Sequence, residues 1–225
     1  HTGTYPPHEE YEANAIIGTD VEYDELGKIT AGTFITVGAK ARETLESSIS
    51  DSKSLSKGSD DTYNVTEKKA YVAEINGTGY ETLAEAVKAA AAGDTITLLS
   101  DIKLTSVQTI SKKLTLDLNG KTLDSTAYRT IQLNFGADLT VQDSVGTGKI
   151  ANSYNGSSYP STVYLNAKDT VFTLVSGTIE SDPYKTSLQS VAINSEKDKA
   201  CTVNIQGGSV VVPAAAKEGR AIVAS

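Results

Sequence analysis

One pattern of three short apolar runs recurs along the chain at intervals of about 30 residues, and this repeat restricts the fold more than any other feature. The first run occupies residues 131–134, 163–166 and 191–194, with a weaker copy at 221–224. The second occupies residues 114–116, 139–141, 172–174 and 203–205. The third is a Gly-x-aliphatic element at 148–150, 177–179 and 208–210, with a looser copy at 120–123. The three elements keep the same order in every copy.

Each run is too short for an amphipathic helix, and its alternation is typical of a half-buried strand. A single unit cannot bury its apolar face, whereas units stacked in register bury a continuous column. Three short strands in each unit predict a coil with three sides, so that the stack forms three parallel sheets around a narrow core. The alternative is a β-sandwich, which requires hairpin turns, and Asn-Gly occurs between strands in only a few places. The sequence therefore predicts a mostly β fold, a parallel β-helix.

Composition agrees with this fold and excludes several functions. The chain has no Trp, no Met and only three Phe, so Val, Ile, Leu, Ala and Thr must fill the core, as suits regular repeated layers. The net charge of -8, with scattered arginines and no basic run, argues against nucleic-acid binding. Cys201 is the only cysteine, which excludes a disulfide or a thiolate cluster within the chain. No apolar run has the length of a membrane span, so we expect no membrane insertion by this fragment.

Three asparagines follow the inward aliphatic residues of the first repeated run, where the chain must leave one sheet for the next. They are Asn134, Asn166 and Asn194. Asparagine tolerates left-handed backbone and bonds to neighbouring main-chain groups. We predict that the three side chains stack as a structural asparagine ladder, with no catalytic role.

A single helix is predicted directly before the repeats. Thr82 and Glu85 form a T-x-x-E capping box, and Gly93 supplies a C-terminal stop. One helical face is apolar, with Leu83, Ala86, Val87, Ala90 and Ala91. Strands are expected at 72–75 and 95–98, on either side of this helix. Its expected role is to cover the open end of the first coil and the unpaired strand edges there.

The residues of this cap also carry a resemblance. The pattern consists of Tyr80, Thr82, Leu83, Glu85, Ala86 and Val87, followed by residues 93–96. It resembles the opening of pectate-lyase-like, right-handed, single-stranded parallel β-helix proteins, and the likeness covers about residues 70–225. Within that fold it is similar to the β-helix regions of adhesin-type surface proteins of Gram-positive gut bacteria. The resemblance implies a secreted or cell-wall-attached, extracellular protein, and it specifies fold far better than function.

The catalytic machinery of the lyases does not follow from the resemblance. Those enzymes use acidic calcium ligands and an arginine as base, whereas Arg129 and Arg220 are about three coils apart, with no carboxylates clustered near them. The outward column that the repeat predicts contains no acid: Gln132, Tyr164, Ala192 and Ile222. Three aspartates recur at different points of the repeat and are interpreted as solvated turn residues: Asp117, Asp143 and Asp169. The sequence therefore assigns no catalytic residue.

No cofactor and no metal ligand are assigned either. The segment from Asp20 to Asp24 begins like a calcium-binding loop, but Glu25 stands where such a loop needs glycine. Ala31 stands where it needs glutamate. A loosely held surface calcium ion at this segment is the one alternative that the sequence leaves open.

The first 65 residues differ from residues 66–225, which we assign to the β-helix. Residues 9–25 carry seven acids and no base, a solvated face. Strands are expected at 14–21 and 30–37 and a helix at 40–49, while the Ser/Lys-rich residues 47–62 are interpreted as a linker or long surface loop. This region is either a small domain or extra strands on the first coil. Because residues 221–225 begin another coil, we expect the natural protein to continue beyond Ser225.

Ligand binding is expected in the loops. Four tyrosines fall in corresponding inter-strand stretches of neighbouring units: Tyr128, Tyr154, Tyr159 and Tyr184. Tyrosines among Asn and Ser suit stacking on sugar rings, although they also suit simple cover of the coil. The sequence thus predicts a non-catalytic module that binds a glycan or a host surface protein. A polysaccharide lyase or hydrolase with catalytic residues outside this fragment, and a purely structural stalk, are the alternatives.

Overall fold

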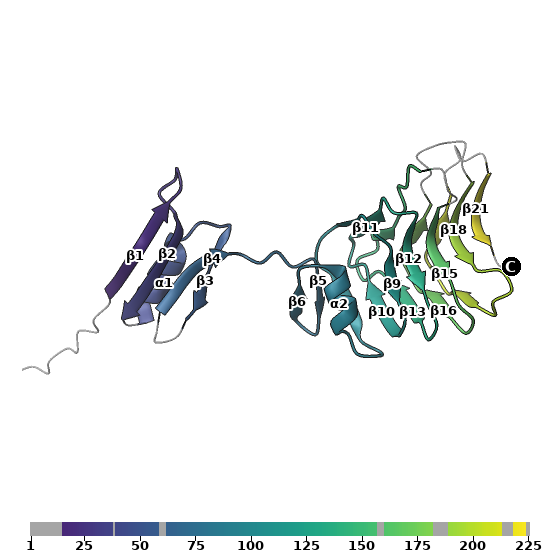
Figure 1. Cartoon of the computed structure of the whole chain (residues 1–225), viewed down its shortest axis with the longest axis horizontal. Helices are drawn as coiled ribbons and strands as arrows, with labels where there is room; N and C mark the ends of the chain where they lie inside the picture. Colours follow the sequence, from purple (N-terminus) through teal and green to yellow (C-terminus); the bar gives the residue numbers. More distant parts are fainter. Residues whose placement is uncertain are drawn as a thin grey trace, which may run out of the picture. The chain divides into compact units, whose positions relative to one another are not determined.

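The computed structural model describes residues 15–37, 39–58, 62–156, 160–181, 189–212 and 218–223. The chain divides into two compact units, His1–Lys69 and Ala70–Ser225, and each is described by itself. Strands dominate both units (Figure 1).

The first unit is an antiparallel sheet with one helix. Sheet A has the order β1-β2-β4-β3, with β1 Ala15–Tyr23, β2 Ile29–Val37, β3 Lys53–Lys57 and β4 Thr62–Glu67. Helix α1, Ala39–Ser48, follows β2 (Figure 1). The prediction of a linker at 47–62 is wrong, because β3 lies inside it and pairs with β4 throughout. Strand β3 is polar except for Leu55, which pairs with Val65 and packs on the core of this unit.

That core is centred on Phe34, which is 3% exposed, with Ile29 and Leu45 around it. The Phe34 ring occupies the space that side chains would take at two glycines. A Cβ on Gly18 would come 2.6 Å from the ring, and one on Gly32 would come 2.8 Å from it. The absence of side chains at these two positions therefore lets the ring pack directly on the sheet.

The second unit is a coil of parallel strands arranged in three sheets (Figure 1, teal to yellow). Sheet B contains β6 Thr78–Tyr80, β5 Ala73–Ile75, β7 Thr95–Leu98, β10 Lys113–Asp117, β13 Asp138–Gln142, β16 Val171–Leu174 and β19 Thr202–Ile205. Sheet C contains β8 Ile102–Leu104, β11 Thr122–Ser125, β14 Lys149–Ile150, β17 Thr178–Glu180 and β20 Ser209–Val211. Sheet D contains β9 Gln108–Ile110, β12 Arg129–Leu133, β15 Ser161–Leu165, β18 Gln189–Ser195 and β21 Glu218–Val223. At the beginning of this unit, β5 pairs with both β6 and β7 in antiparallel fashion.

This arrangement is a β-solenoid of about three turns, and the predicted parallel β-helix is confirmed. The second repeated run stacks in the predicted register, with Leu114, Leu139, Phe172 and Val203 side by side. The third does the same, with Leu123, Ile150, Ile179 and Val210 side by side. Most of these side chains are fully buried, so each sheet contributes a continuous apolar row to the core.

The first run differs from the prediction after its second copy. Ile131 pairs with Val163 as expected, but Val163 pairs with Ile193, two residues beyond the predicted Val191. A slip of two residues leaves the same side chains facing inward, so the apolar pattern cannot distinguish the two registers. The outward column of sheet D is therefore Gln132, Tyr164, Asn194 and Val223, in place of one ending in Ala192 and Ile222.

The predicted cap is present as α2, Leu83–Ala89, at the end of the coil where β5 and β6 lie (Figure 1). The Thr82 hydroxyl accepts from the Glu85 amide at 3.1 Å, and the Glu85 carboxylate accepts from the Thr82 amide at 3.2 Å. Leu83, Ala86 and Val87 are buried. The helix ends before Ala91, which is exposed and whose amide donates to Asp94 at 2.7 Å, so Gly93 lies in the following turn.

Candidate functional site

Four side chains gather on the outer side of sheet D. We call Tyr128, Arg129, Tyr154 and Tyr164 the aromatic cluster. Arg129 is the first residue of β12 and Tyr128 directly precedes it, while Tyr164 belongs to the neighbouring strand β15. Tyr154 lies in the segment between β14 and β15. Since adjacent coils stack in register, residues about 30 positions apart in sequence become neighbours here.

The arginine is held between two rings. Its guanidinium carbon lies 3.3 Å from the ring centroid of Tyr164 and 4.6 Å from that of Tyr128. Tyr128 in turn meets Tyr154 edge to face, with 6.3 Å between centroids and an interplanar angle of 64°. Aromatic pairs prefer this geometry, and a guanidinium over a ring face is a favourable cation–π contact. The cluster is therefore a defined arrangement of three rings and one cation.

Only some of the guanidinium donors of Arg129 have hydrogen-bond partners among the described residues. Nη1 donates to Oε1 of Gln132, the next outward residue of β12. Nε is buried and has no hydrogen-bond partner in the part of the chain that the structure describes. Among those same residues, no carboxylate lies within ion-pair distance of the guanidinium. Among the described residues, Arg129 is therefore contacted by ring faces and one amide.

Tyr164 has a second partner in the next coil, because its hydroxyl donates to Oε2 of Glu196. Burial and this hydrogen bond raise the pKa of Tyr164 to about 12, against the opposing charge of Arg129. The hydroxyl therefore stays protonated at neutral pH and acts as a donor. Sequence reasoning missed Glu196, because only the true register of β18 brings this residue beside Tyr164.

The predicted asparagine ladder has two members in contact. Nδ2 of Asn166 donates to Oδ1 of Asn134 at 3.0 Å, and the same oxygen accepts from Nε2 of Gln132 at 3.0 Å. Asn194 does not continue the ladder, since the shifted register places it beside Tyr164. Its amide lies 3.4 Å from the Ser161 hydroxyl instead.

The predicted ligand-binding tyrosines divide into two groups. Tyr128 is 38% exposed and Tyr154 is half-buried, and these two belong to the aromatic cluster. The Tyr154 hydroxyl lies over Gly156, where a Cβ would come 1.9 Å from it. Tyr159 and Tyr184 lie outside the described residues. The cluster also includes Arg129 and Tyr164, for which no binding role is predicted from the sequence.

Two of the three aspartates interpreted as solvated are in fact buried. Asp117 and Asp143 are each 7% exposed. Asp143 accepts from the Gly148 amide at 2.6 Å and from the Gly120 amide at 2.7 Å, and Asp117 accepts from the Ser144 amide at 3.0 Å. Buried backbone donors at the turns between sheets B and C need acceptors, and these carboxylates supply them. Their oxygens hold the turns together. Asp169 is exposed, in a turn with a φ of 61°.

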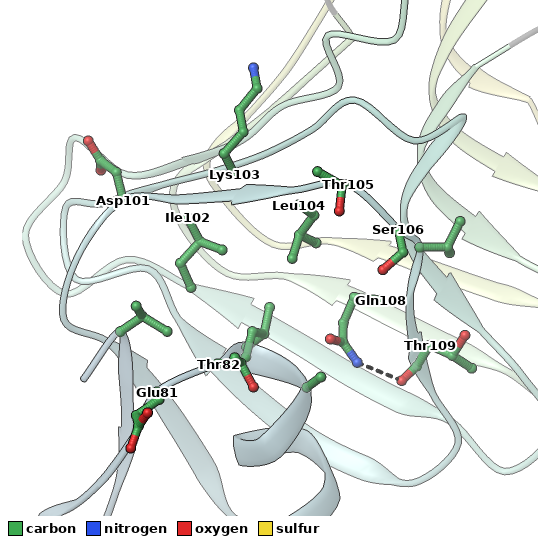
Figure 2. Close-up of a pocket in the computed structure, with 14 residues that line it drawn as sticks. Glu81, Thr82, Asp101, Ile102, Lys103, Leu104, Thr105, Ser106, Gln108 and Thr109 are labelled. Carbon is green, nitrogen blue, oxygen red and sulfur yellow. Dashed lines mark hydrogen bonds between the residues drawn. The ribbon is translucent and has the colours of Figure 1, made fainter. Parts of the chain in front are cut away.

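A second candidate is a groove of about 650 Å³ between α2 and the strands β8 and β9. Figure 2 shows Ile102 and Leu104 pointing into it, while Lys103 points away and bonds to Asp124 and Ser153. The Gln108 amide donates to the Thr109 carbonyl at 3.0 Å (Figure 2). The groove is lined by aliphatic and polar side chains, among them the charged Glu81, Asp101 and Lys103, with no aromatic ring. The groove therefore offers a ligand far less specific chemistry than the aromatic cluster does.

The segment that resembled a calcium loop forms the β1–β2 hairpin. Oδ1 of Asp24 accepts from the amides of Leu26 and Lys28, both at 2.9 Å, and so closes the turn. Across the described ranges, no three His, Cys, Asp or Glu side chains gather closely enough to hold a metal ion. No helix in those ranges combines the length and the apolar character needed to cross a membrane.

The chain matches no family model, no curated protein and no solved structure. The geometry of the aromatic cluster is therefore the basis for assigning a function.

Proposed function

We propose that the β-helix unit, Ala70–Ser225, is a non-catalytic module that binds a glycan through the aromatic cluster. The observation that carries the proposal is the edge-to-face pair of Tyr128 and Tyr154, beside the stacked Arg129. Rings in such a pair are held in fixed orientations, and Tyr128 keeps 38% of its surface exposed. A sugar ring has an apolar C–H face that packs on an aromatic ring and hydroxyls that bond to nearby polar groups. Preformed rings bind such a ligand at a low cost in conformational entropy.

The polar side chains around the rings also suit a glycan. Gln132, Asn134 and Asn166 form a hydrogen-bonded row beside the cluster, with amide groups that both donate and accept. Sugar hydroxyls have the same double capacity. A ligand that crosses from β12 to β15 would meet Asn134 and then Asn166, because adjacent strands lie about 4.8 Å apart.

We propose that the module is non-catalytic because of the pKa and the hydrogen bonds of its ionisable side chains. A general base needs a pKa near the working pH, and the pKa of Tyr164, at about 12, is far above it. Glu196 holds the Tyr164 hydroxyl, while Asp117 and Asp143 accept from turn amides. In the described coils, these acids are engaged in structural bonds. A polysaccharide-processing enzyme would therefore need catalytic groups other than these.

The proposed setting is a secreted or cell-wall-attached surface protein of a Gram-positive bacterium. It is supported by the likeness of the cap, with its Thr82–Glu85 capping box, to pectate-lyase-like β-helix proteins and to adhesin-type surface regions. A stacked β-helix also suits a position on a cell surface, where it would present its loops to ligands.

The test exposes the full chain to immobilised neutral and acidic glycans of plant, mucin and microbial origin. We expect binding to at least one glycan, and a loss of roughly tenfold in affinity for Tyr128→Ala and for Tyr154→Ala. Tyr23→Ala is the matched control, because Tyr23 is 63% exposed in the first unit. Release of reducing or unsaturated ends would contradict the non-catalytic proposal. Failure to bind any glycan would contradict the binding role and favour a stalk or a protein ligand.

A further inference from the structure

Arg129 differs from the other arginine for which the structure gives side-chain partners. Arg42 pairs with Glu46 at 2.9 Å and also has a longer ring contact, with 5.6 Å from its guanidinium carbon to the Tyr63 centroid. Arg129 instead lies between two tyrosine rings, with one amide acceptor and no carboxylate partner in the described part of the chain. Glu196, the acid of the neighbouring coil, is bound to Tyr164. A cation is thus placed beside the exposed Tyr128 ring, and no described residue supplies its counter-charge.

The stacking fixes this cation and leaves its donors free. A guanidinium is planar, and its five N–H groups point outward in that plane, so contact of its faces with rings consumes none of them. Within the described ranges, the bond to Gln132 is the one that uses a donor, and Nε–H is buried without a partner there. Buried N–H groups in native proteins are nearly always paired, so an unpaired one calls for an explanation. An anion at the Nη edge of the guanidinium would supply the missing charge and would accept from the Nη donors that Gln132 does not use.

We infer that the ligand of the aromatic cluster carries an anionic group, a carboxylate or a sulfate ester, and that Arg129 binds it while Tyr128 and Tyr154 contact the sugar ring. This inference rests on the proposed glycan-binding function and names the class of glycan. It makes Arg129 the residue that distinguishes acidic from neutral glycans. The overall charge of -8 would repel an acidic polymer, so selection depends on this local cation.

The experiment compares matched pairs of probes with the full chain. One pair is a sulfated galactan oligosaccharide and its desulfated form, and the other is a polyuronate oligosaccharide and its carboxyl-reduced form. Wild-type protein is expected to bind at least one acidic probe about tenfold more tightly than its neutral counterpart. That affinity should fall as NaCl is raised, because salt screens the ion pair. Preference within the first or the second pair identifies sulfate or carboxylate as the anion, and either supports the inference.

The variants are Arg129→Gln, Arg129→Lys and the control Arg220→Gln. Arg220 is an exposed residue of β21 in the same sheet, so its loss changes the net charge equally. Arg129→Gln should abolish the preference for the acidic probe, Arg129→Lys should keep part of it, and Arg220→Gln should leave it unchanged. Thermal melts show whether each variant is folded. Should Arg129→Gln not fold, the Lys variant and the salt titration of wild-type protein still test the inference.

Two outcomes would overturn the inference, and they are distinguishable. Equal binding of acidic and neutral probes, or an acidic preference that survives in Arg129→Gln, refutes the role of Arg129 and leaves glycan binding intact. Absence of binding to all four probes and to the wider glycan panel refutes the proposed function, and the inference fails with it.

Discussion

The side-chain amide of Asn166 donates a hydrogen bond to Oδ1 of Asn134 in the preceding coil, across 3.0 Å. The two residues follow Leu165 and Leu133, which pair directly in sheet D. The bond therefore joins successive coils at the same corner and supplements the backbone ladder.

Replacing Asn166 by Leu should lower the free energy of unfolding by about 1 kcal/mol, because the Asn134 oxygen loses one donor. For a chain of this size, this corresponds to roughly 2–4 °C in Tm. Asn194→Leu is the control, since its amide has only a long contact of 3.4 Å with Ser161. Equal melting temperatures for wild-type protein and Asn166→Leu would contradict the role of this amide pair.

Gly156 should control the position of Tyr154. A Cβ at this glycine would come 1.9 Å from the Tyr154 hydroxyl, so Gly156→Ala must displace the ring. Because the displaced atom ends a side chain that can turn away, we expect an unchanged Tm together with weaker glycan binding. Asn155→Ala, at the exposed neighbouring residue, is the control. If Gly156→Ala bound glycan as wild-type protein does, Tyr154 would not be part of the site.

Acid should weaken the turns between sheets B and C. Burial alone would raise the pKa of Asp117, but hydrogen bonds from Gln142 and from the amides of Ser144 and Asn119 outweigh it, so the pKa is lowered. The stability that Asp117 contributes is therefore fully present above its unfolded pKa of about 3.9 and is lost as pH falls through the folded value.

Asp117→Asn should accordingly melt below wild-type protein at pH 7, and the difference should shrink as the pH falls below about 4. The measurement is Tm against pH for both proteins. A difference that stayed constant over this range would show that the charge of Asp117 makes no contribution.

Tyr164 should affect stability at the opposite end of the pH scale. Its folded pKa of about 12 exceeds the unfolded value of about 10, because burial and the bond to Glu196 favour the neutral phenol. The corresponding stability is present below about pH 10 and is lost as pH rises toward the folded value. As the pH rises from about 10 to about 12, the Tm of Tyr164→Phe should therefore fall less than the Tm of wild-type protein. The same alkaline loss in both proteins would refute the raised pKa.

The fold was predictable because it depends on a pattern of three short apolar runs, which occurs in several copies along the sequence. The rows through Leu114 and Leu123 have an apolar residue in every coil. The capping box of α2 is recognisable because it lies within four consecutive residues. The first unit was only partly predictable. Strand β3 is stabilised by a single apolar residue, Leu55, within a polar segment, and no local pattern marks it as a strand.

The site was less predictable for a physical reason. Tyr128 and Tyr154 were identified from loop composition, but the roles of Arg129 and Glu196 depend on which coil positions lie side by side. A slip of two residues in β18 keeps the apolar face intact while it changes every outward neighbour. The burial of Asp117 and Asp143 was missed likewise, because it follows from the backbone donors of turns in adjacent coils.

The most direct test of the account observes the tyrosines themselves. The chain has eleven Tyr and no Trp, so carbon-13 labelling of tyrosine gives a small set of aromatic NMR signals, which Tyr128→Phe and Tyr154→Phe assign. On titration with a glycan that binds, both signals should shift and saturate with the same dissociation constant, while the Tyr23 signal stays in place. Binding that leaves the Tyr128 and Tyr154 signals unmoved would contradict the central claim that the aromatic cluster is the ligand site.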